Sequence, residues 1–143
     1  MDIKIANIIN LFQKRNFNEA KLKCIEIQNS YENNPEFLNI FAVILFELKE
    51  YNHSIEKWKK AISLNSNYFR AYENLANAFL NLKKYHDALE YFNKAIKINP
   101  EAFQIYNNIG NTLTKLNKFK EAIDFYDKAI NIKPDNIYGH IFK

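Results

Sequence analysis

The sequence contains the segment Phe69-Arg-Ala-Tyr-Glu-Asn-Leu-Ala-Asn-Ala-Phe79 and, 34 residues further on, the matching segment Phe103-Gln-Ile-Tyr-Asn-Asn-Ile-Gly-Asn-Thr-Leu113. The same spacing relates Pro100 to Pro134. Small, aromatic and aliphatic residues occupy the corresponding positions one period earlier, and a weaker match continues toward the N-terminus. A fixed period of this length indicates a repeat protein. The predicted repeats are 1–34, 35–68, 69–102 and 103–136, followed by 137–143.

Apolar residues within each repeat are spaced as on two successive helices. In the third repeat this spacing covers 72–82 and then 88–98, with a short corner at 83–85. The Asn-Pro pair at the end of the repeat stops the second helix, because proline lacks the N–H that a continuing helix needs. Asn18 and Asn52 lie where second helices are predicted to start, and we expect them to be N-caps. The sequence therefore predicts an all-α protein built from helix pairs.

The composition is that of a globular protein and excludes several other classes. The 143 residues are 48% hydrophobic and 25% charged, and two glycines and three prolines are too few for a turn-rich β-sandwich. One cysteine excludes an intramolecular disulfide framework. No apolar run approaches the roughly 18 residues of a membrane span, and the N-terminus lacks the features of a secretory signal. We therefore expect an intracellular, cytoplasmic protein without membrane insertion.

The repeat pattern resembles that of a known family. The motif Tyr72-x2-Leu75-Ala76-x2-Phe79, continued by Ala88-x3-Phe92-x2-Ala95 and Pro100, is similar to the tetratricopeptide repeat. The resemblance implies an α-α superhelix, a right-handed solenoid of antiparallel helix pairs whose first helices line a concave face. It also implies a noncatalytic scaffold that binds a peptide or helix of a partner protein in that groove. We treat 1–143 as one such domain, in which 137–143 begins a capping helix.

Nucleic-acid binding is not predicted. A related helical repeat of RNA-processing factors carries a tryptophan in its first helix, whereas the single tryptophan here, Trp58, falls in a second helix at a predicted core position. The net charge of +4 is small, and it is spread over the repeats without a one-sided basic stripe. The sequence therefore indicates no specific nucleic-acid partner.

Residues with catalytic or metal-binding potential are few and scattered. Cys24 falls at the position of a large core aromatic in later repeats, so it is predicted to be buried and unreactive. His53, His86 and His140 lie in separate segments and form no helical metal-binding pair. Acidic residues such as Glu50 are interpreted as ordinary surface charges. We predict that the chain is not an enzyme and that it holds no cofactor or metal.

The family resemblance places six positions of each first helix on the concave face. In the third and fourth repeats these positions are rich in asparagine, whose amide can both donate to and accept from a peptide backbone. They resemble the asparagine ladder of O-linked N-acetylglucosamine transferase at Asn74 and Asn108. The alternative is that asparagine is simply frequent in this sequence. The predicted peptide-binding residues of this half are Arg70, Asn74, Asn77, Asn81, Asn107, Asn108, Asn111 and Lys115.

The corresponding positions of the first two repeats are apolar. Because an open apolar surface marks an interaction site, Val43 and Phe46 are predicted to hold an apolar anchor of the partner or to pack against a second copy. In the alternative, a shifted first repeat covers these residues internally. Neither half supplies the cations of the two-carboxylate clamp by which co-chaperones hold acidic chaperone tails. The apolar positions are Ile5, Ile9, Phe12, Ile40, Val43 and Phe46.

Two other functions remain open at the level of sequence. The chain could be the substrate-recruiting part of a larger multidomain enzyme or of a secretion or assembly machine. It could instead be a self-associating structural module that forms homo-oligomers through the apolar ends of the solenoid.

Overall fold

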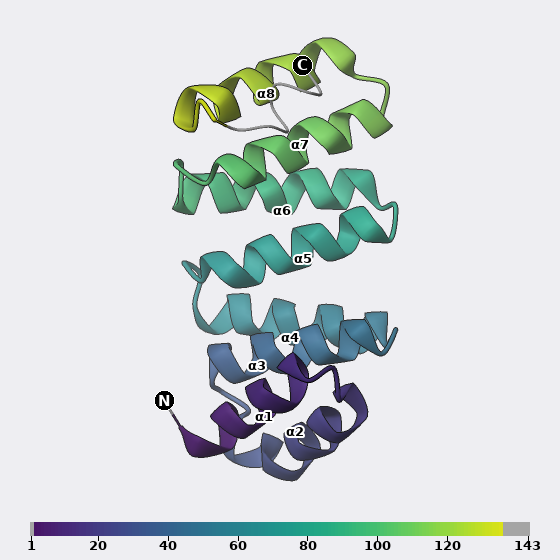
Figure 1. Ribbon diagram of the computed structural model, residues 1–143, viewed down its shortest axis with the longest axis vertical. Coiled ribbons are helices and arrows are strands. Elements are labelled where there is room, and N and C mark those ends of the chain that lie inside the picture. Colours follow the sequence, from purple (N-terminus) through teal and green to yellow (C-terminus); the bar gives the residue numbers. More distant parts are fainter. Residues whose placement is uncertain (1, 136–143) are drawn as a thin grey trace. The chain divides into compact units, whose positions relative to one another are not determined.

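The computed structural model describes residues 2–135, which form eight α-helices and no β-strand (Figure 1). Each predicted repeat contributes one helix pair, so the all-α fold class is confirmed. Asn136, at the end of the fourth repeat, and the predicted capping helix at 137–143 lie outside the described residues. The helices are α1 (Ile3–Gln13), α2 (Phe17–Tyr31), α3 (Pro35–Glu47), α4 (Tyr51–Leu64), α5 (Phe69–Asn81), α6 (Tyr85–Ile98), α7 (Phe103–Lys115) and α8 (Phe119–Ile132).

The chain divides into two compact units, Met1–Ala71 and Tyr72–Lys143. In the first unit α1 packs on α2, α2 on α3 and α3 on α4. In the second unit, which includes α5 from Tyr72 onward, α6 packs on α7 and α7 on α8. The ring of Tyr91 in α6 lies 6.4 Å from that of Tyr72 and 5.6 Å from that of Phe79, both in α5. Within each unit, therefore, apolar faces of consecutive helices are buried against one another.

The turn inside every helix pair has the same left-handed backbone conformation. One residue of each turn is left-handed, and the residue that follows it donates its N–H to a carbonyl near the end of the first helix. Asn16 donates to the carbonyl of Leu11 at 2.9 Å, and Lys84 donates to that of Phe79 at 2.8 Å. This bond satisfies a carbonyl that the helix end leaves open. The first repeat thus has the register of the others, although its sequence matches weakly. The turn residues are Arg15 (φ 59°), Lys49 (φ 64°), Lys83 (φ 60°) and Asn117 (φ 60°).

The second helices begin earlier than the sequence pattern predicts. The N-cap of α2 is Asn16 and that of α4 is Glu50. The predicted N-caps Asn18 and Asn52 are therefore wrong, since both lie in the first helical turn. Tyr85, predicted to be in a corner, is likewise the first residue of α6. The physical reason is the left-handed turn residue, which directs the chain into the second helix only two positions later.

Two buried positions in each helix pair have complementary sizes. One lies in the first helix and the other 16 residues later in the second, and where one is large the other is small. In the fourth repeat the two touch so closely that a Cβ added to Gly110 would lie 2.5 Å from Cε1 of Tyr126. Each pair therefore fills a similar volume at close packing. The pairs are Ile8 with Cys24, Ala42 with Trp58, Ala76 with Phe92 and Gly110 with Tyr126.

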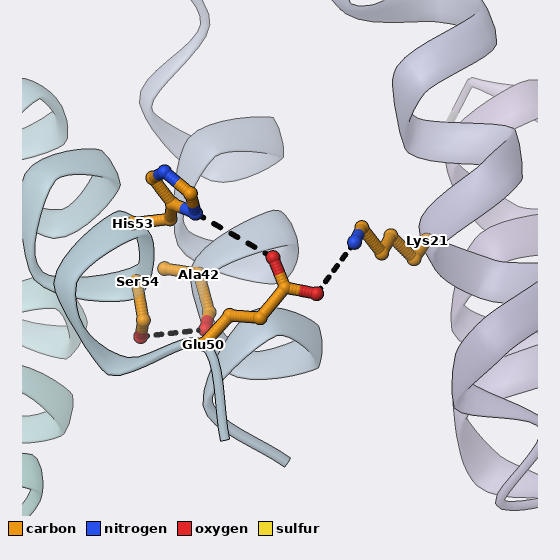
Figure 2. Close-up of polar contacts among 5 residues, drawn as sticks. All are labelled: Lys21, Ala42, Glu50, His53 and Ser54. Atoms are coloured by element: carbon orange, nitrogen blue, oxygen red, sulfur yellow. Dashed lines mark hydrogen bonds and ion pairs between the residues drawn. The ribbon is translucent and has the colours of Figure 1, made fainter. Parts of the chain in front are cut away.

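Buried polar side chains in the first unit are hydrogen-bonded. Trp58 Nε1 donates to Asn39 Oδ1 at 2.9 Å, and Ser54 Oγ donates to the carbonyl oxygen of Ala42 at 2.8 Å (Figure 2). The first bond explains how an asparagine is accommodated within the apolar helix α3. Trp58 is 2% exposed, which confirms its predicted core position. Among the described residues no buried side-chain nitrogen or oxygen lacks a hydrogen-bond partner.

An ion-pair cluster joins α2 to the start of α4 (Figure 2). One carboxylate oxygen of Glu50 accepts a hydrogen bond from Lys21 Nζ, and the other lies 3.5 Å from Nδ1 of His53. The bond from Lys21 lowers the pKa of Glu50. All three side chains are partly exposed, so the stabilisation is small. Glu50 is thus a surface charge, as the sequence predicts, and it also connects two helices.

We expect Gly110→Ala to lower the free energy of unfolding by about 1–3 kcal/mol, because the added methyl group meets the Tyr126 ring. Tyr126→Phe removes the hydroxyl that donates to Asn111 Oδ1 at 2.7 Å and holds the ring in place. In the double variant the ring is free to move away from the methyl group. Its loss of stability, measured by chemical denaturation, should be smaller than the sum of the two single losses. Strictly additive losses would show that the two residues do not constrain each other.

Cys24 should be inert in the folded protein. It is 0% exposed, and burial raises the pKa of its thiol from 9.0 to about 12. Because the thiolate is the reactive form, Ellman's reagent at about pH 8 should label the native protein slowly and the guanidinium-unfolded protein at once. The raised pKa also means that this group's contribution to stability is complete below pH 9.0 and declines as the pH rises toward about 12. Immediate labelling of the native protein would contradict the burial.

Candidate functional site

Two predicted site residues on the first helices of the second unit are joined by a hydrogen bond. Asn108 Nδ2 in α7 donates to Asn77 Oδ1 in α5 at 3.0 Å. Both side chains are half-buried. Each amide has two donor hydrogens and an oxygen that accepts twice, so the bonded pair still offers donors from Asn77 and acceptor capacity from Asn108. Together with Asn81 and Asn111 on the same two helices, this pair forms what we call the amide surface.

A pocket of about 500 Å³ lies at one end of the amide surface. We call it the corner pocket, because it includes the turn between α5 and α6. It brings together three of the predicted site residues, Asn81, Asn111 and Lys115. Lys83 and Tyr85 were not predicted, because they lie in the turn and at the start of a second helix, outside the first-helix positions that the repeat pattern provides. The lining residues are Leu80, Asn81, Lys83, Tyr85, Asn111, Thr114 and Lys115.

A core tyrosine orients Asn111 in this pocket. The Tyr126 hydroxyl donates to Asn111 Oδ1 at 2.7 Å and lies 3.4 Å from Thr114 Oγ1. Burial raises the pKa of Tyr126, which keeps the hydroxyl protonated as the donor. Thr114 Oγ1 donates to the carbonyl of Gly110 at 2.9 Å. With its oxygen engaged by the tyrosine, Asn111 is left with its amide nitrogen as the group available to a ligand.

Other predicted residues of the asparagine-rich half lie elsewhere. Asn107 is 4% exposed and therefore presents almost no surface to a partner. Asn74, the other residue likened to the ladder, is half-buried. Arg70 belongs to the first unit, where it lines a separate cleft of about 450 Å³ with Asn34, Pro35, Glu36, Asn65 and Tyr68.

The predicted apolar half lies in the first unit and is only partly open. Ile5 is 3% exposed and belongs to the core, and Ile9, Phe12 and Ile40 pack partly against it. The rings of Tyr51 and Trp58 lie 5.0 and 6.0 Å from that of Phe46. Internal packing thus accounts for much of this surface. A small apolar cleft of about 150 Å³ remains, lined by Ile9, Phe12, Asn39, Ile40 and Val43.

The remaining sequence candidates for chemistry are dispersed. Cys24 is buried, as predicted, and His53 and His86 are exposed in different helices. His140 lies outside the described residues. Within the described part of the chain, no group of three or more histidine, cysteine or acidic residues is placed to hold a metal ion. Among residues 2–135, no helix combines the length and apolarity needed to cross a membrane.

Several solved structures share this fold. A crystal structure of MamA has a TM-score of 0.87 and 25% identity, covering 99% of this chain and 81% of that one. MamA from Desulfovibrio magneticus RS-1, from residue 41 to its end, has a TM-score of 0.83 and 22% identity over 98% and 81% of the two chains. YrrB, a TPR protein with an unusual peptide-binding site, has a TM-score of 0.85 and 20% identity over 96% and 71%. A comparison with curated proteins found no match.

Family models match the repeats directly. The tetratricopeptide repeat model matches residues 69–102 and 103–136, which are the boundaries predicted for the third and fourth repeats. A second model, described as a TPR repeat, matches residues 43–83. The matches together cover more than half of the chain. With the helix pairs and the 34-residue spacing of their turns, these matches confirm the resemblance, and the chain belongs to the tetratricopeptide repeat family.

Proposed function

We propose that this chain is a noncatalytic protein-interaction scaffold that binds an extended segment of a partner protein along the amide surface of the second unit. The observation that carries the proposal is the hydrogen-bonded amide pair of Asn77 and Asn108. The amides of the two first helices α5 and α7 present donors and acceptors at fixed positions. An extended backbone offers N–H and C=O groups at a regular spacing and can pair with them whatever its side chains are.

Membership of the family supports a role in partner binding. Helical repeat proteins of this kind use extended surfaces of stacked helices for recognition. YrrB, which has the same fold, is described as having a peptide-binding site. The second unit of the present chain adds the amide surface and the corner pocket beside it. The amides on two neighbouring helices favour a bound peptide over a small molecule, because small-molecule sites are enclosed and mostly apolar.

The first unit supplies a separate contact in this proposal. Its small apolar cleft, bordered by Val43, has the volume of a single side chain and is walled mainly by apolar residues, with Asn39 as the one polar residue of its lining. We infer that it holds one apolar side chain of the partner. Phe46 contributes indirectly, since its ring packs on Tyr51 and Trp58.

Replacing both members of the amide pair should weaken peptide binding without unfolding the protein. Linear peptides would be selected from a random displayed library on the immobilised wild-type protein, and their affinities measured by fluorescence anisotropy. We expect the double variant Asn77→Ala/Asn108→Ala to bind them about tenfold more weakly, because each lost hydrogen bond contributes about 0.5–1.5 kcal/mol. Circular dichroism should show unchanged helix content.

The matched control is the double variant Asn93→Ala/Asn131→Ala. It removes two exposed asparagines from the second helices α6 and α8, so it changes composition equally but leaves the amide surface intact. Its affinity for the selected peptides should equal that of the wild type. If the two double variants bind equally well, the amide surface is not the binding site.

The apolar cleft is tested by comparing two adjacent residues of α3. Val43 borders the cleft and is half-buried, whereas Ile44 is 0% exposed in the core. We expect Val43→Asp to keep its helix content and lose capture of partners that use the cleft. Ile44→Asp should unfold the first unit, because a charge cannot be buried there without a partner. Unfolding by Val43→Asp would instead show that this position is part of the core.

A further inference from the structure

The corner pocket carries a charge pattern that the amide surface does not explain. Its lining includes Lys83 and Lys115 and no acidic residue. Both lysines are exposed, and neither has an ion-pair partner among the residues that the structure describes. Two lysines outside the pocket do have acidic partners in the second unit, Lys94 with Glu90 and Lys118 with Glu121. The lining of the pocket therefore carries a local excess of positive charge.

The hydrogen-bonding groups of the pocket are mainly donors. The bond from Tyr126 occupies the oxygen of Asn111 and leaves its amide N–H groups free to donate. Thr114 uses its own proton on the carbonyl of Gly110. Lysine ammonium groups donate and cannot accept. A ligand group that accepts hydrogen bonds and carries negative charge can therefore pair with both lysines and with the amide N–H groups of Asn111.

The position of Lys83 is set by the backbone rather than by a mobile loop. It is the left-handed residue of the turn between α5 and α6, with φ 60°, and its N–H donates to the carbonyl of Leu80 at 3.0 Å. Lys115 lies in the last turn of α7, where a cation also favours the helix dipole. That role accounts for one lysine, but not for the second lysine or for the oriented amide beside them.

We propose that the corner pocket binds a carboxylate of the partner segment, so that the scaffold selects acidic peptides. This inference rests on the proposed peptide-binding function, since Asn81 and Asn111 belong to both the amide surface and the pocket. The carboxylate is that of an aspartate or glutamate side chain or of a peptide C-terminus. The site differs from the two-carboxylate clamp considered from the sequence, because that clamp would use other first-helix positions, among them Asn74 and Asn108.

The test is a double-mutant cycle between the protein and the peptides selected on it. In each peptide, aspartate is changed to asparagine, glutamate to glutamine, or the C-terminal carboxylate to an amide. One of these changes should weaken wild-type binding about tenfold, and which one does so identifies the source of the carboxylate. Lys83→Gln/Lys115→Gln should bind the unmodified peptide about tenfold more weakly and should respond less than about twofold to the same peptide change.

A control variant, Lys97→Gln/Lys120→Gln, removes the same amount of charge from exposed sites outside the pocket. It should retain the full response to the peptide change, and circular dichroism should show both variants folded. The pocket assignment would be overturned if both lysine variants responded equally to the peptide change. It would also be overturned if no carboxylate change in the selected peptides weakened wild-type binding. Either result would leave the proposal of peptide binding intact. If no peptide is enriched on the wild type, the proposed function itself fails, and the carboxylate site fails with it.

Discussion

The second unit depends on the packing of the Tyr126 ring against the bare backbone of Gly110. Because glycine has no Cβ, the ring occupies space that any other residue would fill, as the 2.5 Å approach to an added Cβ shows. This contact brings α7 and α8 together and carries the tyrosine hydroxyl to Asn111, one residue beyond the glycine. A core contact therefore orients an amide of the binding surface. Packing and ligand chemistry are physically coupled at this point of the fold.

The first unit contains a related device with different residues. Trp58, at the position equivalent to Tyr126, donates its indole N–H to Asn39 in the preceding helix, and Asn39 borders the apolar cleft. In the remaining two repeats the equivalent residues are Phe92 and Cys24. Phenylalanine has no polar group to donate, and the buried thiol is a weak donor. In both repeats that carry a polar aromatic at this core position, that side chain bonds an asparagine of the preceding first helix, and the bonded asparagine lines a pocket.

The 34-residue period predicts the fold because the small and large residues that pack together within each helix pair recur at the same positions of every repeat. It does not reveal the left-handed turns, since none of the four turn residues is a glycine, and the helix starts are misplaced for that reason. On the surface, the period pairs Asn108 with its equivalent Asn74, whereas the structure bonds it to Asn77, one helical turn further along α5. That displacement comes from the packing of neighbouring helix pairs, which no single-repeat pattern contains. The single-repeat pattern likewise does not reveal that Asn107 is buried, nor that Lys83 lies in the turn beside the corner pocket.

Amide contacts alone cannot provide the affinity of a scaffold of this kind. Each hydrogen bond to a partner replaces bonds to water and contributes about 0.5–1.5 kcal/mol, whereas association has to offset about 4–15 kcal/mol of lost motional freedom. In the proposed complex, Asn77 and Asn108 would keep a bound segment extended, but their hydrogen bonds would supply only part of its affinity. The rest of the affinity must come from pairing opposite charges or from removing apolar area from water. The residues available for this are the unpaired lysines of the corner pocket and the walls of the apolar cleft. On the proposed function, selectivity among partners would therefore come from the side chains next to the asparagines, even though the asparagines are the feature that the sequence displays most clearly.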